Sequence, residues 1–363
     1  MLDCQKSCGI SHVDEYRSMP RKPGKRPTIY DIAARAETSA STVSLVLNGS
    51  WQRYRINPET AKRVLETSDR LGYNINLRAR GLRLKQSRLA GMVIPHYRNR
   101  FFAGLAETFE DEVRRRGLCP VVVSTQRDPA TERTVIETLV AQQVELLIIT
   151  GVDNPDELNA ICSKAGVPCV NLDLPGRGAP SVVSDNRGGS HKLTGLLIDA
   201  VLAGRGDPST IRFVGGRANE YATEERAMGF ARAFMDAGID IKDEWVIRCG
   251  YKPSAARTVM RDLAREQAGF PAGLFINSIT SLEGFAEFMR SDWKACRDTI
   301  LCCFDWDPFA ASLPLPTIMM RQNVEGLIER SFAILDGAIP GTPDPIVVQP
   351  TLEIVRTKPS IAA

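Results

Sequence analysis

The strongest constraint on the fold is an alternation of apolar runs and amphipathic stretches that begins near Leu89 and continues for most of the chain. The apolar runs are short enough to be buried strands, and the stretches between them repeat apolar residues at helical spacing. Strands that alternate with helices indicate parallel sheets with helices on both faces. We therefore expect an α/β body of doubly wound parallel sheets.

The alternation occurs twice. The first set predicts strands at 91–95, 120–124, 146–150 and 167–172, and helices at 101–116, 131–142 and 156–165. After Asp185 the pattern restarts, with strands at 211–214, 245–249, 273–276 and 299–303 and helices at 193–202, 224–237, 255–265 and 282–290. This length requires two lobes, and a ligand is expected at the strand carboxyl ends, in the cleft between them.

The charge is divided unevenly along the 363 residues. Residues 1–90 carry a net charge of +9, whereas residues 91–363 carry −6. A basic head on an acidic body indicates an anionic polymer bound by the head, and the alternative is a solvated basic tail. No stretch approaches about 18 apolar residues, which excludes a membrane span, and residues 1–27 lack the apolar core of a secretory signal. Nine cysteines without a disulfide framework indicate a cytoplasmic chain with reduced thiols, and a DNA-binding head would make it nucleoid-associated.

The head is predicted to contain three short helices. Thr28 can cap a helix over 29–36, and Thr38 or Ser39 can cap a second helix that ends at Leu47, before Asn48 and Gly49. Asn57 and Pro58 start a third helix that runs to residue 71. Two short helices joined by a tight turn, with a third to complete the core, are typical of a helix-turn-helix unit.

Three runs in the head carry a family resemblance. Residues 28–33 (TIYDIA), 41–48 (STVSLVLN) and 78–83 (RARGLR) resemble the head of the LacI/GalR transcriptional regulators. The likeness covers nearly all of residues 28–357. It implies an all-α helix-turn-helix head and an α/β body of two doubly wound parallel-sheet lobes of the periplasmic-binding-protein type.

The resemblance implies that the second helix enters the major groove of DNA. The base-reading positions fall on Ala40, Ser41 and Leu45, which are short or apolar and offer few hydrogen bonds to bases. The family usually has glycine in the turn where this chain has Glu37. Further DNA contacts are expected from Thr28, Tyr30, Ser39, Thr42 and Asn48.

The linker at 76–88 is expected to be the hinge helix of the family. Leu82 matches the leucine that wedges into a minor-groove step, and Asn76 and Ala79 match its neighbours. An ordinary charged linker is the alternative. Residues 49–55 form a longer connection than usual, as in the fructose-type branch that includes the catabolite repressor–activator. Arg53, Tyr54 and Arg55 are candidate phosphate contacts there.

Effector contacts are expected where predicted strands end or where family motifs recur. Arg226 matches the effector-clamping arginine of the family, and the absence of Asp after Asn277 favours the fructose-type branch. Leu174 replaces an arginine of that branch, so Arg98 or Arg100 would have to supply an anion contact. Asp185 has a helix cap as its alternative role. The expected set is Arg98, Arg100, Phe101, Phe102, Asp173, Asp185, Arg226, Asn277, Ser278, Asp305 and Trp306.

The sequence thus predicts a regulator that represses, and possibly also activates, genes of sugar metabolism. Expected partners are a palindromic operator, a sugar or sugar-phosphate effector, and further copies of the chain in a dimer or tetramer. No cofactor, metal or catalytic group is predicted, because no nucleophile with a general base is recognisable. A non-sugar corepressor and a sugar-modifying enzyme with a DNA-binding head are the alternatives.

The expected division of the chain is as follows. Residues 1–27 form a disordered basic extension, with Met19 as a second candidate start, and 28–75 form the DNA-binding domain. The hinge at 76–88 precedes the two-lobed domain at 89–358, and 359–363 form a tail. The N-lobe is expected at 89–187 plus 319–345, and the C-lobe at 188–318 plus 346–358.

Overall fold

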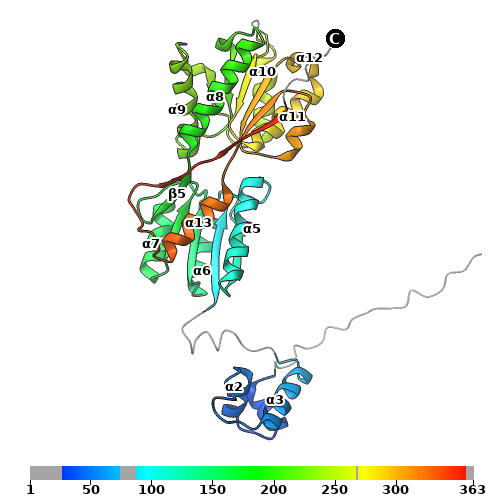
Figure 1. Cartoon of the computed structure of the whole chain (residues 1–363), viewed down its shortest axis with the longest axis vertical. Helices are drawn as coiled ribbons and strands as arrows, with labels where there is room; N and C mark the ends of the chain where they lie inside the picture. The colour runs from blue at the N-terminus through cyan, green and yellow to red at the C-terminus, as the bar shows by residue number, and fades with distance from the viewer. Residues whose placement is uncertain (1–26, 74–86, 267–268, 357–363) are drawn as a thin grey trace, which may run out of the picture. The chain divides into compact units, whose positions relative to one another are not determined.

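The computed structural model describes residues 27–73, 87–266 and 269–356 (Figure 1). The chain divides into two compact units, Met1–Leu84 and Lys85–Ala363, which are described separately. No helix among the described residues is long and apolar enough to cross a membrane.

The first unit contains three helices, α1 (Ile29–Arg35), α2 (Ala40–Leu47) and α3 (Pro58–Arg70). Their inward faces form one small core, in which Ile32, Val43, Val46 and Val64 are almost fully buried. All three helices lie where the sequence predicts them. So small a unit has few apolar groups to bury, so each of these contacts carries a large share of its stability.

Local capping sets the helix boundaries in this unit. The Thr28 side chain accepts a hydrogen bond from the Asp31 backbone N–H, and the Asp31 carboxylate accepts one from the Thr28 N–H at 2.7 Å, which is a capping box. Ser39 caps α2 by accepting from the Thr42 N–H at 3.1 Å. Between the two helices Glu37 has φ of 49°, the left-handed conformation that glycine adopts more easily.

The second unit has two lobes, and the sheet of the first lobe contains six strands in the order β11-β5-β4-β3-β1-β2. Neighbouring strands in this order are all parallel. The strands are β1 (Leu89–Ile94), β2 (Cys119–Ser124), β3 (Leu146–Thr150), β4 (Cys169–Leu172), β5 (Ser181–Ser184) and β11 (Ile346–Val348). The helices of this lobe are α5 (Arg100–Arg115), α6 (Pro129–Ala141), α7 (Pro155–Ala165) and α13 (Val324–Leu335).

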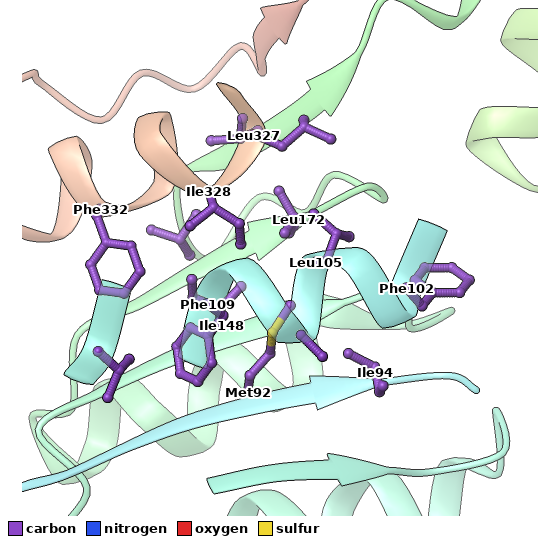
Figure 2. Close-up of a cluster of buried hydrophobic side chains, with 14 of the residues drawn as sticks. Met92, Ile94, Phe102, Leu105, Phe109, Ile148, Leu172, Leu327, Ile328 and Phe332 are labelled. Atoms are coloured by element: carbon purple, nitrogen blue, oxygen red, sulfur yellow. The ribbon is translucent and has the colours of Figure 1, made fainter. Parts of the chain in front are cut away.

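Helices cover both faces of this sheet. Figure 2 shows one face, where Phe109 of α5 and Phe332 of α13 lie over Met92 of β1 and Ile148 of β3. The two phenyl rings stack with their centroids 6.0 Å apart. On the other face α6 and α7 pack their apolar side chains, including the buried Cys162, against β1 and β3. The lobe is therefore the three-layer arrangement that the alternation predicts.

The second lobe repeats this plan around a sheet of order β12-β10-β9-β8-β6-β7, in which only the β10–β12 pair is antiparallel. The strands are β6 (Arg212–Val214), β7 (Val246–Ile247), β8 (Gly273–Ile276), β9 (Ile300–Phe304), β10 (Thr317–Arg321) and β12 (Thr351–Arg356). Figure 1 shows α8 (Asn186–Ala203) and α9 (Tyr221–Asp236) on one side of the sheet, and α10 (Pro253–Leu263), α11 (Ile279–Ser291) and α12 (Trp293–Cys296) on the other. Short 3₁₀ turns lie at Pro208–Thr210, Asp243–Trp245 and Pro308–Ser312.

Two predicted strands are shorter than expected. The strand expected at 167–172 begins at Cys169, because Pro168 has no N–H to donate to a neighbouring strand. The strand expected at 245–249 is reduced to Val246–Ile247, since Asp243–Trp245 form a 3₁₀ turn. The other strands predicted before residue 304 match within a few residues.

Among the described residues, the chain crosses between the lobes at three places: after β5, after β10 and after β11. Two expected boundaries need correction. The N-lobe was expected to resume at residue 319, but β10 belongs to the second sheet as far as Arg321. The C-lobe was expected to resume at residue 346, but β11 belongs to the first sheet. Each of these strands is hydrogen bonded to strands of its sheet that lie elsewhere in the chain, and a local sequence pattern does not show which sheet a strand joins.

Candidate functional site

The carboxyl ends of strands from both lobes border a pocket of about 620 Å³. Side chains of the first lobe come from the segments after β1, β2 and β4, and those of the second from the segments after β6, β7, β8, β9 and β10. Seven of the expected effector residues line it: Arg98, Phe101, Phe102, Asp173, Arg226, Ser278 and Asp305. This is the interlobe position that parallel sheets predict for a ligand.

Two buried carboxylates face this pocket from opposite lobes. Asp173 follows β4 and Asp305 follows β9, and they are 5% and 4% exposed. Burial raises the pKa of Asp173 to about 7, although the nearby Arg226 opposes the shift. Burial also raises the pKa of Asp305, opposed by Arg226 and by a hydrogen bond from Gln322. Carboxylates withdrawn from water in this way need hydrogen-bond donors from the protein or from a ligand.

Asp305 is held by groups from three elements. Its Oδ1 accepts from the Gln322 side-chain amide at 2.6 Å, and its Oδ2 accepts from the Ile279 N–H at 3.3 Å. The nearby Asn99 side chain also helps to keep the pKa of this carboxyl down. Asn99 itself caps α5 by accepting from the Phe101 N–H at 2.9 Å. These hydrogen bonds hold the carboxylate in one orientation, and a group that is already ordered costs less entropy when it binds a ligand.

Arg226 is the buried cation of the pocket, at 4% exposure. Its Nε donates to Asn186 Oδ1 at 2.8 Å and its Nη1 donates to the Asn277 carbonyl oxygen at 2.6 Å. Its guanidinium lies 3.9 Å from the centroid of the Phe304 ring. Because these two hydrogen-bond partners are neutral, the positive charge is available to the two pocket carboxylates and to a bound ligand.

An interlobe ion cluster of Arg127, Asp153, Arg217 and Glu220 lies beside the pocket. Arg127 and Asp153 belong to the first lobe, and Arg217 and Glu220 to the second. Arg127 lies 3.2 Å from the Glu220 carboxylate and 3.6 Å from that of Asp153, and Arg217 pairs with Asp153. Tyr251 donates its hydroxyl to Glu220 and stacks beneath Arg127, 5.1 Å from ring centroid to guanidinium carbon. The cluster therefore bridges the two lobes.

Four expected effector residues do not line this pocket. Arg100 pairs with Asp307 at 2.7 Å and lies over Trp306; both Arg100 and Trp306 border a second cavity of about 320 Å³. Asp185 instead caps α8 by accepting from the Gly188 N–H at 2.8 Å, the alternative role considered for it. Asn277 contributes its backbone carbonyl to Arg226, while its buried side-chain amide makes no hydrogen bond within the described structure.

Sequence reasoning missed Arg127, Arg217, Tyr251 and Gln322, all of which line the pocket. Asn99, which follows the first predicted strand and precedes a predicted helix, also lines the pocket. Gln322 follows β10, a strand the alternation did not include. The interlobe ion cluster joins residues far apart in sequence, and no local pattern predicts such a contact.

The expected DNA-reading face of α2 is open to solvent. Val43 and Val46 are buried in the helical core, whereas Ser41 is exposed and Ala40 and Leu45 are half-buried. Tyr30 is 72% exposed and Tyr54 is 58% exposed, and Arg53 and Arg55 are exposed beside it. Thr28, Ser39 and Thr42 form the caps of α1 and α2, and Asn48 ends α2. Asn76, Ala79 and Leu82 lie outside the described residues.

A helix-turn-helix unit followed by a two-lobed body with a polar interlobe pocket defines a ligand-responsive DNA-binding regulator. Family models support this assignment in both parts. Residues 28–76 match the model for bacterial regulatory proteins of the lacI family, and residues 90–312 match that of the periplasmic binding protein domain. The chain belongs to the LacI family of bacterial regulatory proteins.

Individual relatives agree with the family assignment. The chain is 44% identical over 193 residues to the ribitol operon repressor of Klebsiella aerogenes, an alignment that covers 53% of this chain and 72% of the repressor. The fold is similar to the Lac repressor dimer bound to operator and the anti-inducer ONPF, with a TM-score of 0.71 and 20% identity over 90% of this chain and 98% of that chain. It is also similar to the Cra dual regulator of Pseudomonas putida in complex with fructose 1-phosphate, with a TM-score of 0.64 and 22% identity over 74% of this chain and 99% of that chain.

These findings confirm the family, the fold class and the predicted function. The chain is a DNA-binding transcriptional regulator of sugar metabolism, with operator DNA and a small effector as its partners. The curated relatives are regulators rather than enzymes.

Proposed function

We propose that the chain binds its operator as a homodimer and that a polyhydroxylated effector of the sugar class, bound in the interlobe pocket, controls this binding. The observation that carries the proposal is the pair of buried carboxylates, Asp173 and Asp305, on either side of the buried Arg226. Sugar hydroxyls both donate and accept hydrogen bonds, so they satisfy all three groups at once. Phe101 and Phe102 supply the apolar wall on which the C–H face of a sugar packs.

The expected sugar phosphate has a place in this pocket, but only at its rim. Arg100 is committed to Asp307, and Arg127 and Arg217 are neutralised within the interlobe ion cluster. Arg98 from the first lobe and Lys252 from the second also line the pocket. A phosphate therefore fits best near Arg98 and Lys252, with the sugar hydroxyls directed inward. Ribitol is the neutral candidate, because a relative is named as a ribitol operon repressor.

The DNA-binding role falls on the first unit and on the hinge. We assign base contacts to Ala40, Ser41 and Leu45 of α2, and phosphate contacts to residues such as Arg53 and Arg55. Their exposure on one small helical unit supports the assignment. Because the base-reading side chains offer few hydrogen bonds, phosphate contacts and DNA shape are expected to supply much of the affinity.

The chain is proposed to act in the cytoplasm and to have no catalytic activity. General acid–base catalysis needs two groups whose pKa values are moved apart. Here burial raises the pKa of both Asp173 and Asp305, which suits ligand binding. Incubation with a panel of sugars and sugar alcohols, followed by product analysis, tests this; any turnover contradicts it.

The direct test is fluorescence anisotropy on the chain's own upstream DNA at fixed salt, with competitor DNA present. Titrations with ribitol, ribose, fructose and fructose 1-phosphate identify the effector class. A response to a neutral compound would indicate that Asp173 and Asp305 provide the main effector contacts. A response only to the phosphate ester would indicate that Arg98 and Lys252 are required for effector binding. Arg226→Ala is expected to abolish the response while operator binding persists. Specific binding that no sugar alters would overturn the effector proposal.

A further inference from the structure

The second cavity, of about 320 Å³, is bounded by both lobes. Its lining from the first lobe belongs to α5 and α13, and its lining from the second lobe follows β9 or ends β10. Phe101, Asp305 and Gln322 line this cavity as well as the interlobe pocket, so the two spaces share a wall. The volume is at the lower end of the range for small-molecule sites, which makes this cavity a candidate site of its own.

Two guanidinium groups lie over the indole ring of Trp306 in this cavity. The guanidinium carbons of Arg100 and Arg321 are 5.9 and 4.8 Å from the centroid of the ring. The Nε of Arg100 donates to Asp307, whereas its two Nη groups have no acceptor among the described residues. The Arg321 side chain is exposed and forms no hydrogen bond or ion pair with any residue that the structure describes. These unused donors have the planar arrangement that a carboxylate matches.

Two carboxylates in the lining of the same cavity lack a cationic partner. Glu107 of α5 and Glu325 in the first turn of α13 are both exposed. Neither side chain forms an ion pair or a hydrogen bond within residues 27–73, 87–266 and 269–356. The second cavity therefore offers unpaired groups of both signs, and a ligand of one charge alone leaves one set unused.

We propose that the second cavity binds a small zwitterion, an α-amino acid with an apolar side chain. The carboxylate of the ligand accepts hydrogen bonds from the two guanidinium groups, and its ammonium group donates to the two unpaired glutamates. Phe101 and Val324 also line the cavity and provide apolar surface for the side chain of the ligand. An amino acid thus satisfies every part of the lining that the protein leaves unpaired.

The shared wall links this site to the effector. Gln322 donates to Asp305 Oδ1 at 2.6 Å and accepts from Ser184 Oγ at 2.6 Å. Asp305 is a proposed effector contact, so this step rests on the proposed function. An amino acid held between α5 and the end of β10 stabilises the arrangement in which the lobes touch. Each ligand is therefore expected to tighten the binding of the other, because such coupling is reciprocal.

Isothermal titration calorimetry of the full chain, without DNA or effector, tests the site. The probes are L-leucine, L-valine and L-phenylalanine, each compared with its N-acetyl form, which lacks the ammonium group, and its amide, which lacks the carboxylate. At least one amino acid is expected to bind about tenfold more tightly than both of its blocked forms. No binding of any of the three, or equal binding of a blocked form, would overturn the proposal. Because no effector is present, this result does not depend on whether a sugar controls operator binding.

Variants place the amino acid in the second cavity. Arg321→Gln, and Glu107→Gln combined with Glu325→Gln, are each expected to weaken binding about tenfold or more, since each removes charged hydrogen-bond partners. Arg330→Gln removes an exposed arginine of α13 that does not line the cavity, and this matched control should bind as the wild type does. Asp173→Asn changes only the interlobe pocket and should also leave binding unchanged. Binding that is lost in Asp173→Asn but kept in Arg321→Gln would place the amino acid in the interlobe pocket and contradict the proposal.

The coupling has its own measurement. Effector titrations of the operator complex are repeated with the amino acid at a saturating concentration. We expect a lower apparent dissociation constant for the effector in the wild type and no change in Arg321→Gln. An unchanged constant in the wild type, with amino acid binding confirmed by calorimetry, would overturn the coupling through the shared wall.

Discussion

At the scale of single residues, both pocket carboxylates have unusual backbone conformations. Asp173 has φ of 74° and Asp305 has φ of 123°, each immediately after a strand. A non-glycine residue in this region is strained, and such strain is retained where the surrounding structure imposes it. Here the strain turns each carboxylate into the pocket as the strand ends. The position of the site therefore depends partly on strained backbone conformations, which lower the free energy of unfolding.

Asp173→Asn is expected to stabilise the chain without effector. The carboxyl of Asp173 has a pKa of about 7 in the folded chain, against about 3.9 in an unfolded one, so its contribution to stability is lost as pH rises from about 4 to about 7. Three pKa units correspond to roughly 4 kcal/mol as an upper bound. Asparagine has no charge to bury, so the melting temperature should exceed that of the wild type at pH 8 and differ least near pH 4.

The same substitution should weaken the effector response, because a carboxylate acceptor is replaced by an amide. Calorimetric melting from pH 4 to pH 8 and effector titration measure the two effects together. An Asp173→Asn variant that is less stable than the wild type at pH 8 would show that the carboxylate contributes native contacts that outweigh its burial cost.

Glu37→Gly is expected to stabilise the first unit. Glu37 is exposed and has φ of 49°, a conformation that costs a residue with a side chain about 1 kcal/mol more than glycine. Part of this gain is offset because glycine makes the unfolded chain more flexible. Hydrogen exchange of peptides from residues 28–47 in the full chain measures the effect. Slower exchange is expected, and faster exchange would mean that the Glu37 side chain makes a stabilising contact.

At the scale of elements, α8 and α9 approach closely at Gly229. A Cβ there would lie 2.2 Å from the Arg187 carbonyl oxygen, which is backbone and cannot rotate away. Gly229→Ala must therefore separate the two helices. Arg226, one turn earlier on α9, would move away from Asn186 on α8. We expect a lower melting temperature and a weaker effector response in this variant.

Gly195→Ala provides the matched control for this packing argument. Gly195 lies in the interior of α8, and a Cβ there meets nothing within 4 Å. Alanine favours a helix over glycine by about 1 kcal/mol, so this variant should be slightly more stable, with an unchanged effector response. Equal losses in both variants would indicate that neither effect comes from the α8–α9 contact.

The sequence predicts most elements because their signals are local. Thr28, Ser39 and Asn57 cap the helices of the first unit, and alternating periodicities mark the strands and helices of the body. The alternation did not predict β5, β10, β11 or β12. The pairing of β11 and β12 depends on tertiary context, because β11 joins a sheet whose other strands lie much earlier in the sequence and β12 pairs with the edge of the second sheet.

The pocket residues also fall into those that the sequence predicts and those that it does not. Arg226, Asp173 and Asp305 lie at motifs or strand ends and were predicted. Gln322 and Tyr251 were not, because their roles depend on partners in other segments: Gln322 donates to Asp305, and Tyr251 donates to Glu220. Sequence reasoning also placed Asp185 and Trp306 in the effector set. Asp185 is used as a helix cap, and Trp306 lies between Arg100 and Arg321 at the second cavity.

At the scale of the whole body, charged groups join the two lobes at two places. The interlobe ion cluster lies beside the pocket, and the Arg100–Asp307 pair joins α5 to the segment after β9. These contacts contribute to the free energy of the arrangement in which the two lobes touch, which we call the closed arrangement. An effector that binds this arrangement better than an open one shifts the population towards it. The strength of the interlobe contacts therefore sets part of the apparent effector affinity.

Glu220→Gln tests this coupling, because Glu220 is the most buried member of the cluster. Glutamine keeps the size of the side chain but removes the charge that pairs with Arg127. A buried ion pair that loses one partner leaves an uncompensated charge, so the closed arrangement should be less populated. We expect apparent effector affinity to fall about tenfold, equivalent to about 1.4 kcal/mol, and the radius of gyration in small-angle X-ray scattering to rise without effector.

Glu224→Gln is the control that separates lobe closure from a general loss of charge. Glu224 lies in the first turn of α9, the turn directly after the N-cap residue Glu220, and pairs with Arg248 within the second lobe, at 2.7 Å. Its loss should leave both the scattering curve and the effector affinity close to wild type. If Glu220→Gln also leaves both unchanged, the interlobe ion cluster does not contribute to closure. If both variants weaken the affinity alike, the pocket responds to the net charge of the second lobe rather than to contacts between the lobes.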